Sequence, residues 1–212
     1  MLFFELRFPV LGTLIPSDHG YPLFSSLSRH VPAIHHTNEI FFDTLAGRVQ
    51  KDHRTWINPD TKLKIRATQA HLSSLLALTY QELPLVQYSI RLGVPEIVPI
   101  EPASNLYART VTIKNHQHSE TFLAAVQQKL NALEISTTPV VGRRRVMCIG
   151  GHKVVGFSLW LQHVGNEASL FLIRHGIGGR RHIGCGFFHA IHRFQAEKRW
   201  QADRPKTSSP IG

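Results

Sequence analysis

The stretch Tyr107-Ala-Arg-Thr-Val-Thr-Ile113 decides the fold, because with it the chain starts a strand-and-helix order for the second time. The alternation of its side chains predicts a strand. Ser119 is suited to cap a helix. The apolar residues that follow recur on one helix face: Phe122, Val126, Leu130 and Leu133. The stretch therefore indicates a strand followed by a helix.

The first half of the chain has the same order. Residues 2–10 alternate as a strand, and apolar residues recur at helical spacing over residues 23–31. Residues 62–68 alternate between apolar and mostly basic side chains, which predicts a strand with one basic face. We expect a second helix over residues 72–83 and an extended stretch over residues 94–100.

After its helix, the second half continues with strands over residues 144–149 and 154–163. We expect residues 168–174 to form a further strand, paired with 154–163 as a hairpin.

A strand–helix–strand order that occurs twice predicts an α+β fold with two tandem ferredoxin-like (RRM-like) domains. The expected boundaries are residues 1–101 for the N-terminal domain and residues 102–190 for the C-terminal domain with a glycine-rich loop. We expect residues 191–212 to be a basic tail, and residues 190–200, at its start, could form a short helix.

The glycine-rich loop is Arg174-His-Gly-Ile-Gly-Gly-Arg-Arg-His-Ile-Gly-Cys-Gly-Phe-Phe188. Backbone N–H groups at glycines can approach a ligand closely, and the interleaved cations suit a polyanion such as a nucleic-acid backbone. The absence of G-x-G-x-x-G and of G-K-[ST] disfavours a mononucleotide site. The alternative is a glycine-bearing hairpin with solvated arginines. Both readings predict surface exposure, and the surrounding charge favours binding of a polyanion.

The formal charge of +10 is concentrated near the carboxyl end. Residues 142–212 carry 12 Lys and Arg against 3 Asp and Glu, whereas residues 1–141 carry 12 against 11. Such a basic region is typical of phosphate-backbone binding. A membrane surface is the weaker alternative, because the region does not read as one amphipathic helix.

Composition excludes several other classes of protein. With 42% hydrophobic residues the chain can bury a core, and no apolar run approaches the roughly 20 residues of a membrane span. Cys148 and Cys185 lie far apart, which indicates neither a disulfide framework nor a zinc knuckle. We therefore expect a cytoplasmic protein that does not enter a membrane.

The sequence contains few of the residue patterns that are typical of metal sites. The fourteen histidines include no H-E-x-x-H, and His116-Gln-His118 is weak evidence alone. The carboxylates lack the D-x-D or D-x-E grouping of two-metal nucleases. We expect no metal and no other cofactor. RNA cleavage without metal would use the 2′-OH as nucleophile, with a general base, a general acid and cations.

Two histidines flank the first predicted helix, His19 before it and His35 after it. Either histidine alone would more often be a polar surface residue. Together with the basic glycine-rich loop, they are candidates for proton transfer.

These residues together resemble the CRISPR-associated endoribonucleases of the Cas-six family, especially its myxobacterial (MYXAN) variant. The matching segments span most of the chain: Phe8-Pro9, Asp18-His-Gly-Tyr-Pro-Leu23, Leu27-Ser-Arg29, Pro32-Ala-Ile-His35, Ala108-Arg-Thr-Val-Thr-Ile-Lys114, Gly142-Arg-Arg-Arg-Val146 and Gly178-Gly-Arg-Arg-His-Ile-Gly-Cys-Gly-Phe187. Residues 170–176 also resemble a strand near the end of the type I-F processing nuclease.

The resemblance implies a metal-independent endoribonuclease that binds CRISPR repeat stem-loops. It would cut precursor CRISPR RNA into guide RNAs by 2′-OH attack and stay bound as a subunit of the effector complex. The implied partners are repeat RNA, guide RNA and other effector-complex subunits.

The resemblance also implies site residues. Ile34-His35 is similar to the position of the family's general base, and His19 or Tyr21 would supply the second catalytic group. The RNA-binding candidates are the basic and glycine residues of the matching segments: Lys114, Arg143, Arg144, Arg145, Arg174, Gly178, Gly179, Arg180, Arg181 and His182.

Two other functions remain open from the residues alone. One is a non-catalytic RNA-binding subunit of a ribonucleoprotein complex, which basic composition does not separate from a nuclease. The other is a sequence-tolerant ribosomal or DNA-associated basic protein, which would leave the paired histidine sites unexplained.

Overall fold

The computed structural model describes residues 2–50, 52–149 and 152–191, and these residues pack into two compact units. The first unit comprises the described residues up to Ile100 together with Arg180–Cys185. The second comprises Glu101–Gly179 and the described residues from Gly186 on. The central part of the glycine-rich loop therefore belongs to the first unit, although the sequence predicts it as part of the second domain.

The main sheet of the first unit has the strand order β3–β6–β1–β9, with all neighbours antiparallel. Its strands are β1 (Phe3–Leu11), β3 (Ile40–Phe42), β6 (Lys62–Thr68) and β9 (Glu96–Pro99). Helix α1 (Gly20–His30) follows β1, and the 3-10 turn η1 (Gln69–His71) with helix α3 (Leu72–Leu76) follows β6. This order of strands and helices is that of a ferredoxin-like domain.

Smaller elements are inserted into this unit. The hairpin of β7 (Glu82–Leu85) and β8 (Tyr88–Leu92) pairs with the end of β1. A separate small sheet joins β2 (Leu14–Pro16), β5 (Arg54–Trp56) and β4 (Arg48–Val49). Helix α2 (Ala33–His36) adds one turn after α1.

The two faces of β1 differ in the way its alternation predicts. Leu6 and Phe8 are fully buried on one face, where they form the core of the unit. On the other face Glu5 is paired in register with Arg66 of β6, and their side chains form a buried ion pair of 2.8 Å. Burial is the main cause that lowers the pKa of Arg66, and the carboxylate of Glu5 opposes it.

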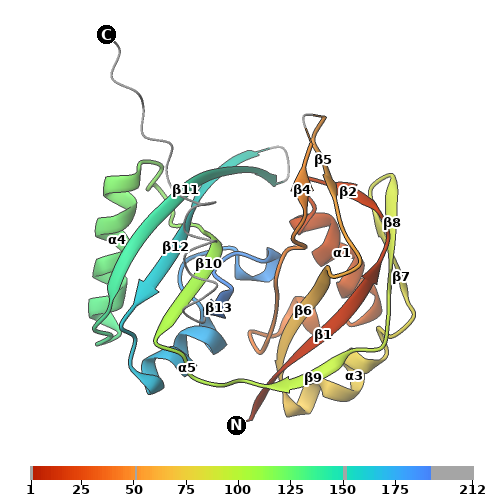
Figure 1. Ribbon diagram of the computed structural model, residues 1–212, viewed down its shortest axis with the longest axis horizontal. Helices are drawn as coiled ribbons and strands as arrows, with labels where there is room; N and C mark the ends of the chain where they lie inside the picture. Colours follow the sequence, from red (N-terminus) through yellow and green to blue (C-terminus); the bar gives the residue numbers. More distant parts are fainter. Residues whose placement is uncertain (1, 51, 150–151, 192–212) are drawn as a thin grey trace. The chain divides into compact units, whose positions relative to one another are not determined.

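The second unit has the element order β–α–β–β–α–β. Its elements are β10 (Asn105–Val111), α4 (Ser119–Ala132), β11 (Thr138–Ile149), β12 (His152–Gln162), α5 (Asn166–His175) and β13 (Phe188–Ala190). The sheet order β11–β12–β10–β13 completes a ferredoxin-like domain. Helix α4 lies along β11 (Figure 1), and Phe122 of this helix packs 4.8 Å from Phe157 of β12 between ring centroids. The predicted fold class is confirmed.

Two expected elements are wrong. Residues 168–174 belong to helix α5, not to a strand, because Ser169, Leu172 and Ile173 are buried at helical spacing on one face. The helix expected over residues 72–83 ends at Leu76, and Leu83 is a buried residue of β7. Short apolar runs fit either period, so the packing partner decides between helix and strand.

The expected exposure of the glycine-rich loop is wrong in part. Residues 183–188 are buried, while Gly179, Arg180 and His182 are exposed. The basic tail from residue 192 on, and with it most of the short helix expected over residues 190–200, lies outside the described residues, while Ala190 is the last residue of strand β13.

No helix of the described residues is long and apolar enough to cross a membrane.

Candidate active site

A surface hollow of about 440 Å³ lies in the first unit beside α1 and α2. Its lining residues are Tyr21, Phe24, Ser25, Ser28, Arg29, Pro32, His35 and His36. The hollow therefore contains His35 and Tyr21, two of the three catalytic candidates from the sequence.

His35 owes its position to the break between the two helices. Helix α1 ends at His30, and the N–H of its C-cap Val31 makes the last helical hydrogen bond, to the carbonyl of Leu27. Pro32 has no N–H to continue this helix and precedes the single turn of α2. Ile34 is buried and anchors this turn, so the next residue, His35, is exposed. Its ring lies 5.6 Å from the ring of Phe24 between centroids. An exposed imidazole on an anchored turn is accessible to a substrate.

Tyr21 lies at the start of α1, and its side chain remains 51% exposed. Its ring centroid is 6.2 Å from that of Phe24. Phe24 is 9% exposed and belongs to the core, so it supports both Tyr21 and His35. Phe24 could not be recognised as part of the site from the sequence, because its apolar character predicts only a core position.

His19 has a different environment, since it is 3% exposed and both of its ring nitrogens are engaged. Nδ1 donates to the carbonyl of Pro16 at 2.8 Å, and Nε2 accepts the backbone N–H of Leu45 at 2.9 Å. A carbonyl can only accept and an N–H can only donate, so these contacts define the neutral Nδ1–H tautomer. They favour a structural role for His19 over the catalytic role expected from the sequence.

The central part of the glycine-rich loop forms the 3-10 turn η2 (Arg181–Ile183), which packs on the first unit. Left-handed backbone at Arg180 and Gly184, with φ of 58° and 89°, brackets the turn. A Cβ at Gly184 would meet Thr44 Cγ2 at 2.7 Å, and one at Gly20 would meet the carbonyl oxygen of Ile183 at 2.8 Å. The glycines therefore allow close backbone packing here, a role other than ligand contact.

The turn presents polar side chains next to α1. Arg181 lies over the ring of Phe41 with its guanidinium carbon 5.5 Å from the centroid. His182 approaches Phe24 edge to face at 5.2 Å between centroids. Burial lowers the pKa of His182, and Arg180 and His35 lower it further. The structure thus groups His35, Tyr21 and Arg180–His182 on the first unit.

The other RNA-binding candidates lie on the second unit. Arg143 and Arg144 are exposed on β11, where the register with β12 shifts between Val141 and Arg144. Arg145 donates to the carbonyl of Arg109 at 2.8 Å. The remaining candidates are an exposed Lys114 after β10, a half-buried Arg174 on α5, and Gly178 and Gly179, which pack on Thr112.

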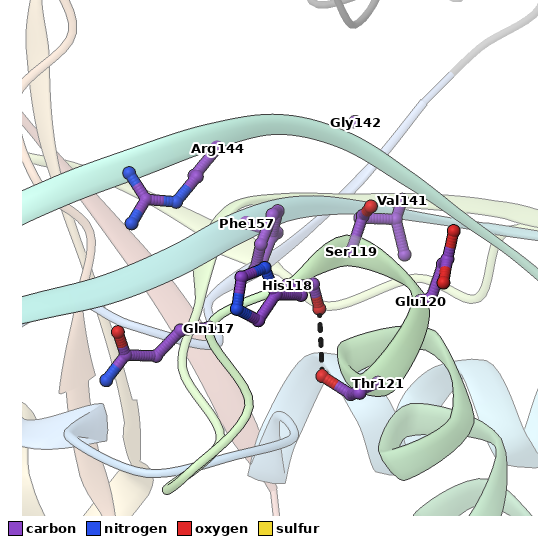
Figure 2. A pocket seen from close by; sticks show the side chains of 9 residues that line it. All are labelled: Gln117, His118, Ser119, Glu120, Thr121, Val141, Gly142, Arg144 and Phe157. Carbon is purple, nitrogen blue, oxygen red and sulfur yellow. Dashed lines mark hydrogen bonds between the residues drawn. The ribbon is translucent and has the colours of Figure 1, made fainter.

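A second hollow, of about 680 Å³, lies in this unit at the start of α4. Figure 2 shows Gln117, His118 and Arg144 around it, with Phe157 behind His118. His118 precedes the helix without a side-chain cap, and its carbonyl accepts a hydrogen bond from the Thr121 hydroxyl at 3.2 Å. Arg144 therefore borders an open hollow that several polar side chains also line, a suitable position for a cation that contacts phosphate.

Among the described residues, no group of three or more His, Cys, Asp and Glu side chains could hold a metal ion.

Two ferredoxin-like units, a histidine-lined hollow and a basic glycine-rich turn define a tandem ferredoxin-like protein with an exposed imidazole site. Residues 4–193 match the model of the Cas6 CRISPR family. The chain is 39% identical over 188 residues to the "CRISPR-associated endonuclease Cas6" of Myxococcus xanthus, covering 89% of this chain and 81% of the relative. The chain belongs to the Cas6 family.

Solved structures share the fold at low sequence identity. A Cas6-related protein from Pyrococcus furiosus has a TM-score of 0.67 at 12% identity, with 91% of this chain and 99% of that chain covered. Thermus thermophilus Cse3, solved with an RNA representing a pre-cleavage complex, has a TM-score of 0.58 at 12% identity, with 91% and 100% covered. These likenesses support the fold described above.

Proposed function

We propose that this protein is an endoribonuclease that binds the stem-loop of a CRISPR repeat and cuts precursor CRISPR RNA into guide RNAs. The observation that carries the proposal is the exposed His35, held on a buried Phe24 beside Tyr21 and the basic turn Arg180–His182. The Myxococcus relative named as a Cas6 endonuclease and the RNA-bound Cse3 structure support the same reaction and substrate class.

The reaction needs no metal in this proposal, because the substrate carries its own nucleophile. The 2′-OH next to the scissile phosphate attacks phosphorus, a histidine accepts its proton, and the 5′-oxygen leaves with a proton from an acid. The products are a 2′,3′-cyclic phosphate and a 5′-hydroxyl. In this proposal His35 is a proton-transfer residue of the reaction, and Tyr21 donates a hydrogen bond to the substrate.

Cations of both units bind the RNA backbone. Arg180 and Arg181 contribute from the first unit, and Arg143, Arg144 and Lys114 from the second. After cleavage the protein stays on the product stem-loop as a subunit of an effector complex, since release would require breaking the same phosphate contacts. The expected cytoplasmic location stays a prediction.

Cleavage of the cognate repeat tests the function. We expect single-turnover cleavage in excess EDTA and a 2′,3′-cyclic phosphate end, and a 2′-deoxy substitution at the cut site should abolish it. Tight binding of the repeat without any cleavage would instead indicate a non-catalytic RNA-binding subunit. Equal affinity for the repeat and for scrambled RNA would contradict both functions and indicate a sequence-tolerant basic protein.

A further inference from the structure

His182 lies against the same phenylalanine ring as His35. The ring of Phe24 is 5.2 Å from His182 and 5.6 Å from His35 between centroids. Phe24 is buried, with 9% of its surface exposed, whereas both histidines are exposed. A core side chain therefore holds two solvent-accessible imidazoles that come from positions 147 residues apart.

The position of His182 is determined by the backbone of its turn. The next residue, Ile183, is 2% exposed, and its carbonyl oxygen packs so closely on Gly20 that a Cβ there would approach to 2.8 Å. Gly184 packs equally closely on Thr44. Because the turn contributes backbone atoms to both contacts, we expect a change of the His182 side chain to leave the turn in place.

We propose that His182 is the second proton-transfer residue of this site and that it acts with His35 on the same scissile phosphate. The proposal rests on the proposed endoribonuclease function. It replaces His19, whose two ring nitrogens are occupied by Pro16 and Leu45. The stretch that the sequence assigned to RNA binding then also contributes to the chemistry.

The pair balances the protons of the reaction. One neutral imidazole takes the proton of the 2′-OH while the bond from the 2′-oxygen to phosphorus forms. The other imidazole, in its protonated form, gives its proton to the 5′-oxygen while the bond from phosphorus to that oxygen breaks. One neutral and one protonated histidine are therefore sufficient for both proton transfers, and the cleavage step needs no other acid or base.

The surrounding charges favour one assignment of the two roles. Burial lowers the pKa of His182, and Arg180 of the same stretch and His35 of α2 lower it further, which favours the neutral form of this imidazole. A neutral imidazole accepts a proton, which makes His182 the group that deprotonates the 2′-OH. His35 is then the donor to the leaving oxygen, the reverse of the role that the family resemblance implied.

A substrate with sulfur in place of the bridging 5′-oxygen separates the two roles, because a thiolate leaves without a proton donor. The variants are His35→Gln and His182→Gln, with His30→Gln as the matched control, since His30 is exposed on the last turn of α1 and outside the hollow. Single-turnover rates are measured at saturating protein with the cognate repeat in its oxygen and sulfur forms. Thermal unfolding and repeat affinity are measured for each variant.

We expect both active-site variants to cut the oxygen substrate about 10²–10⁴-fold more slowly than the wild type. With the sulfur substrate, His35→Gln should regain a rate close to that of the wild type, while His182→Gln stays slow. A wild-type rate for His182→Gln with the oxygen substrate would overturn the proposal, and rescue of His182→Gln by sulfur would overturn the assignment of roles. Failure of the wild-type protein to cut either substrate would instead overturn the proposed function itself.

Discussion

At the scale of single residues, His35 and His19 differ in what surrounds their rings. His35 is exposed beside a hollow, whereas His19 links the carbonyl of Pro16 to the backbone N–H of Leu45 in the core. The first arrangement suits exchange of a proton with a ligand, and the second joins two chain segments. The two histidines should therefore respond differently to substitution.

His35→Ala should slow cleavage about 10²–10⁴-fold and leave the affinity for the repeat within a few-fold. A proton-transfer residue contributes about 10²–10⁴-fold to the rate and little to ground-state binding. The measurement is the single-turnover rate under saturating protein, together with a binding titration. A wild-type rate for this variant would remove His35 from the reaction.

His19→Ala should lower stability, because the buried N–H of Leu45 loses its acceptor. An unpaired buried donor costs about 1–3 kcal/mol, which denaturant unfolding can measure. His30→Ala is the control, since that histidine is exposed. The folded fraction of His19→Ala should still cleave the repeat, and unchanged stability combined with lost cleavage would return His19 to the chemistry.

At the scale of elements, the turn η2 connects the glycine-rich stretch to the first unit. Gly20 at the start of α1 packs on the carbonyl of Ile183, and Thr44 after β3 packs on Gly184, so a glycine allows the close approach at each contact. The arginines of the turn are therefore presented from a tightly packed backbone, not from a freely moving loop.

Gly184→Ala should destabilise this turn. The new Cβ would meet Thr44 Cγ2 at 2.7 Å, at a backbone φ of 89° that other residues rarely adopt. Strain of this kind costs about 1–3 kcal/mol. Gly179→Ala is the matched control for stability, because the nearest atom to its Cβ is 3.8 Å away. Equal melting temperatures for the two variants would contradict the close packing of the turn.

Replacing both Arg180 and Arg181 by Ala should weaken RNA binding and flatten its dependence on salt. Each lost phosphate contact lowers the slope of log K against log salt by about 0.7 for single-stranded RNA and about 0.9 for a duplex. A loss of roughly one to two units is expected if both side chains contact phosphate. An unchanged slope with lost discrimination against a substituted base pair would indicate base recognition instead. Unchanged affinity would remove the turn from the binding site.

At the scale of the whole molecule, the uneven charge is the dominant feature. Residues 192–212 contain five Lys and Arg against two Asp and Glu, and they follow the last described strand. Positive charge of this kind raises affinity for any phosphate backbone without reading its sequence.

Removal of residues 192–212 should therefore weaken binding to scrambled RNA at least as much as binding to the repeat. The cleavage rate at saturating protein should not change, because the proposed proton-transfer residues lie before this segment. Electrophoretic mobility shifts at several salt concentrations measure the first effect, and single-turnover kinetics measure the second. A lower saturating rate would show that the tail takes part in forming the site.

The sequence by itself determined the fold class, because alternating strands such as residues 62–68 and the helix face of residues 119–133 repeat one order in both halves of the chain. It also identified Arg180 and Arg181 as candidates for RNA binding and His35 as a candidate for proton transfer, since interleaved cations and a histidine after a proline-broken helix are local patterns. Only the tertiary structure decided that residues 166–175 form a helix, because their apolar residues fit both periods until a packing face is known.

Only the tertiary structure separated the histidines as well. Hydrogen bonds from distant segments occupy His19, while the packing of η2 on α1 brings His182 to the ring of Phe24, which also supports His35. These relations join residues far apart in the chain. Spacing along a sequence determines which residues share one face of an element, whereas the contacts between elements depend on how their backbones pack in three dimensions.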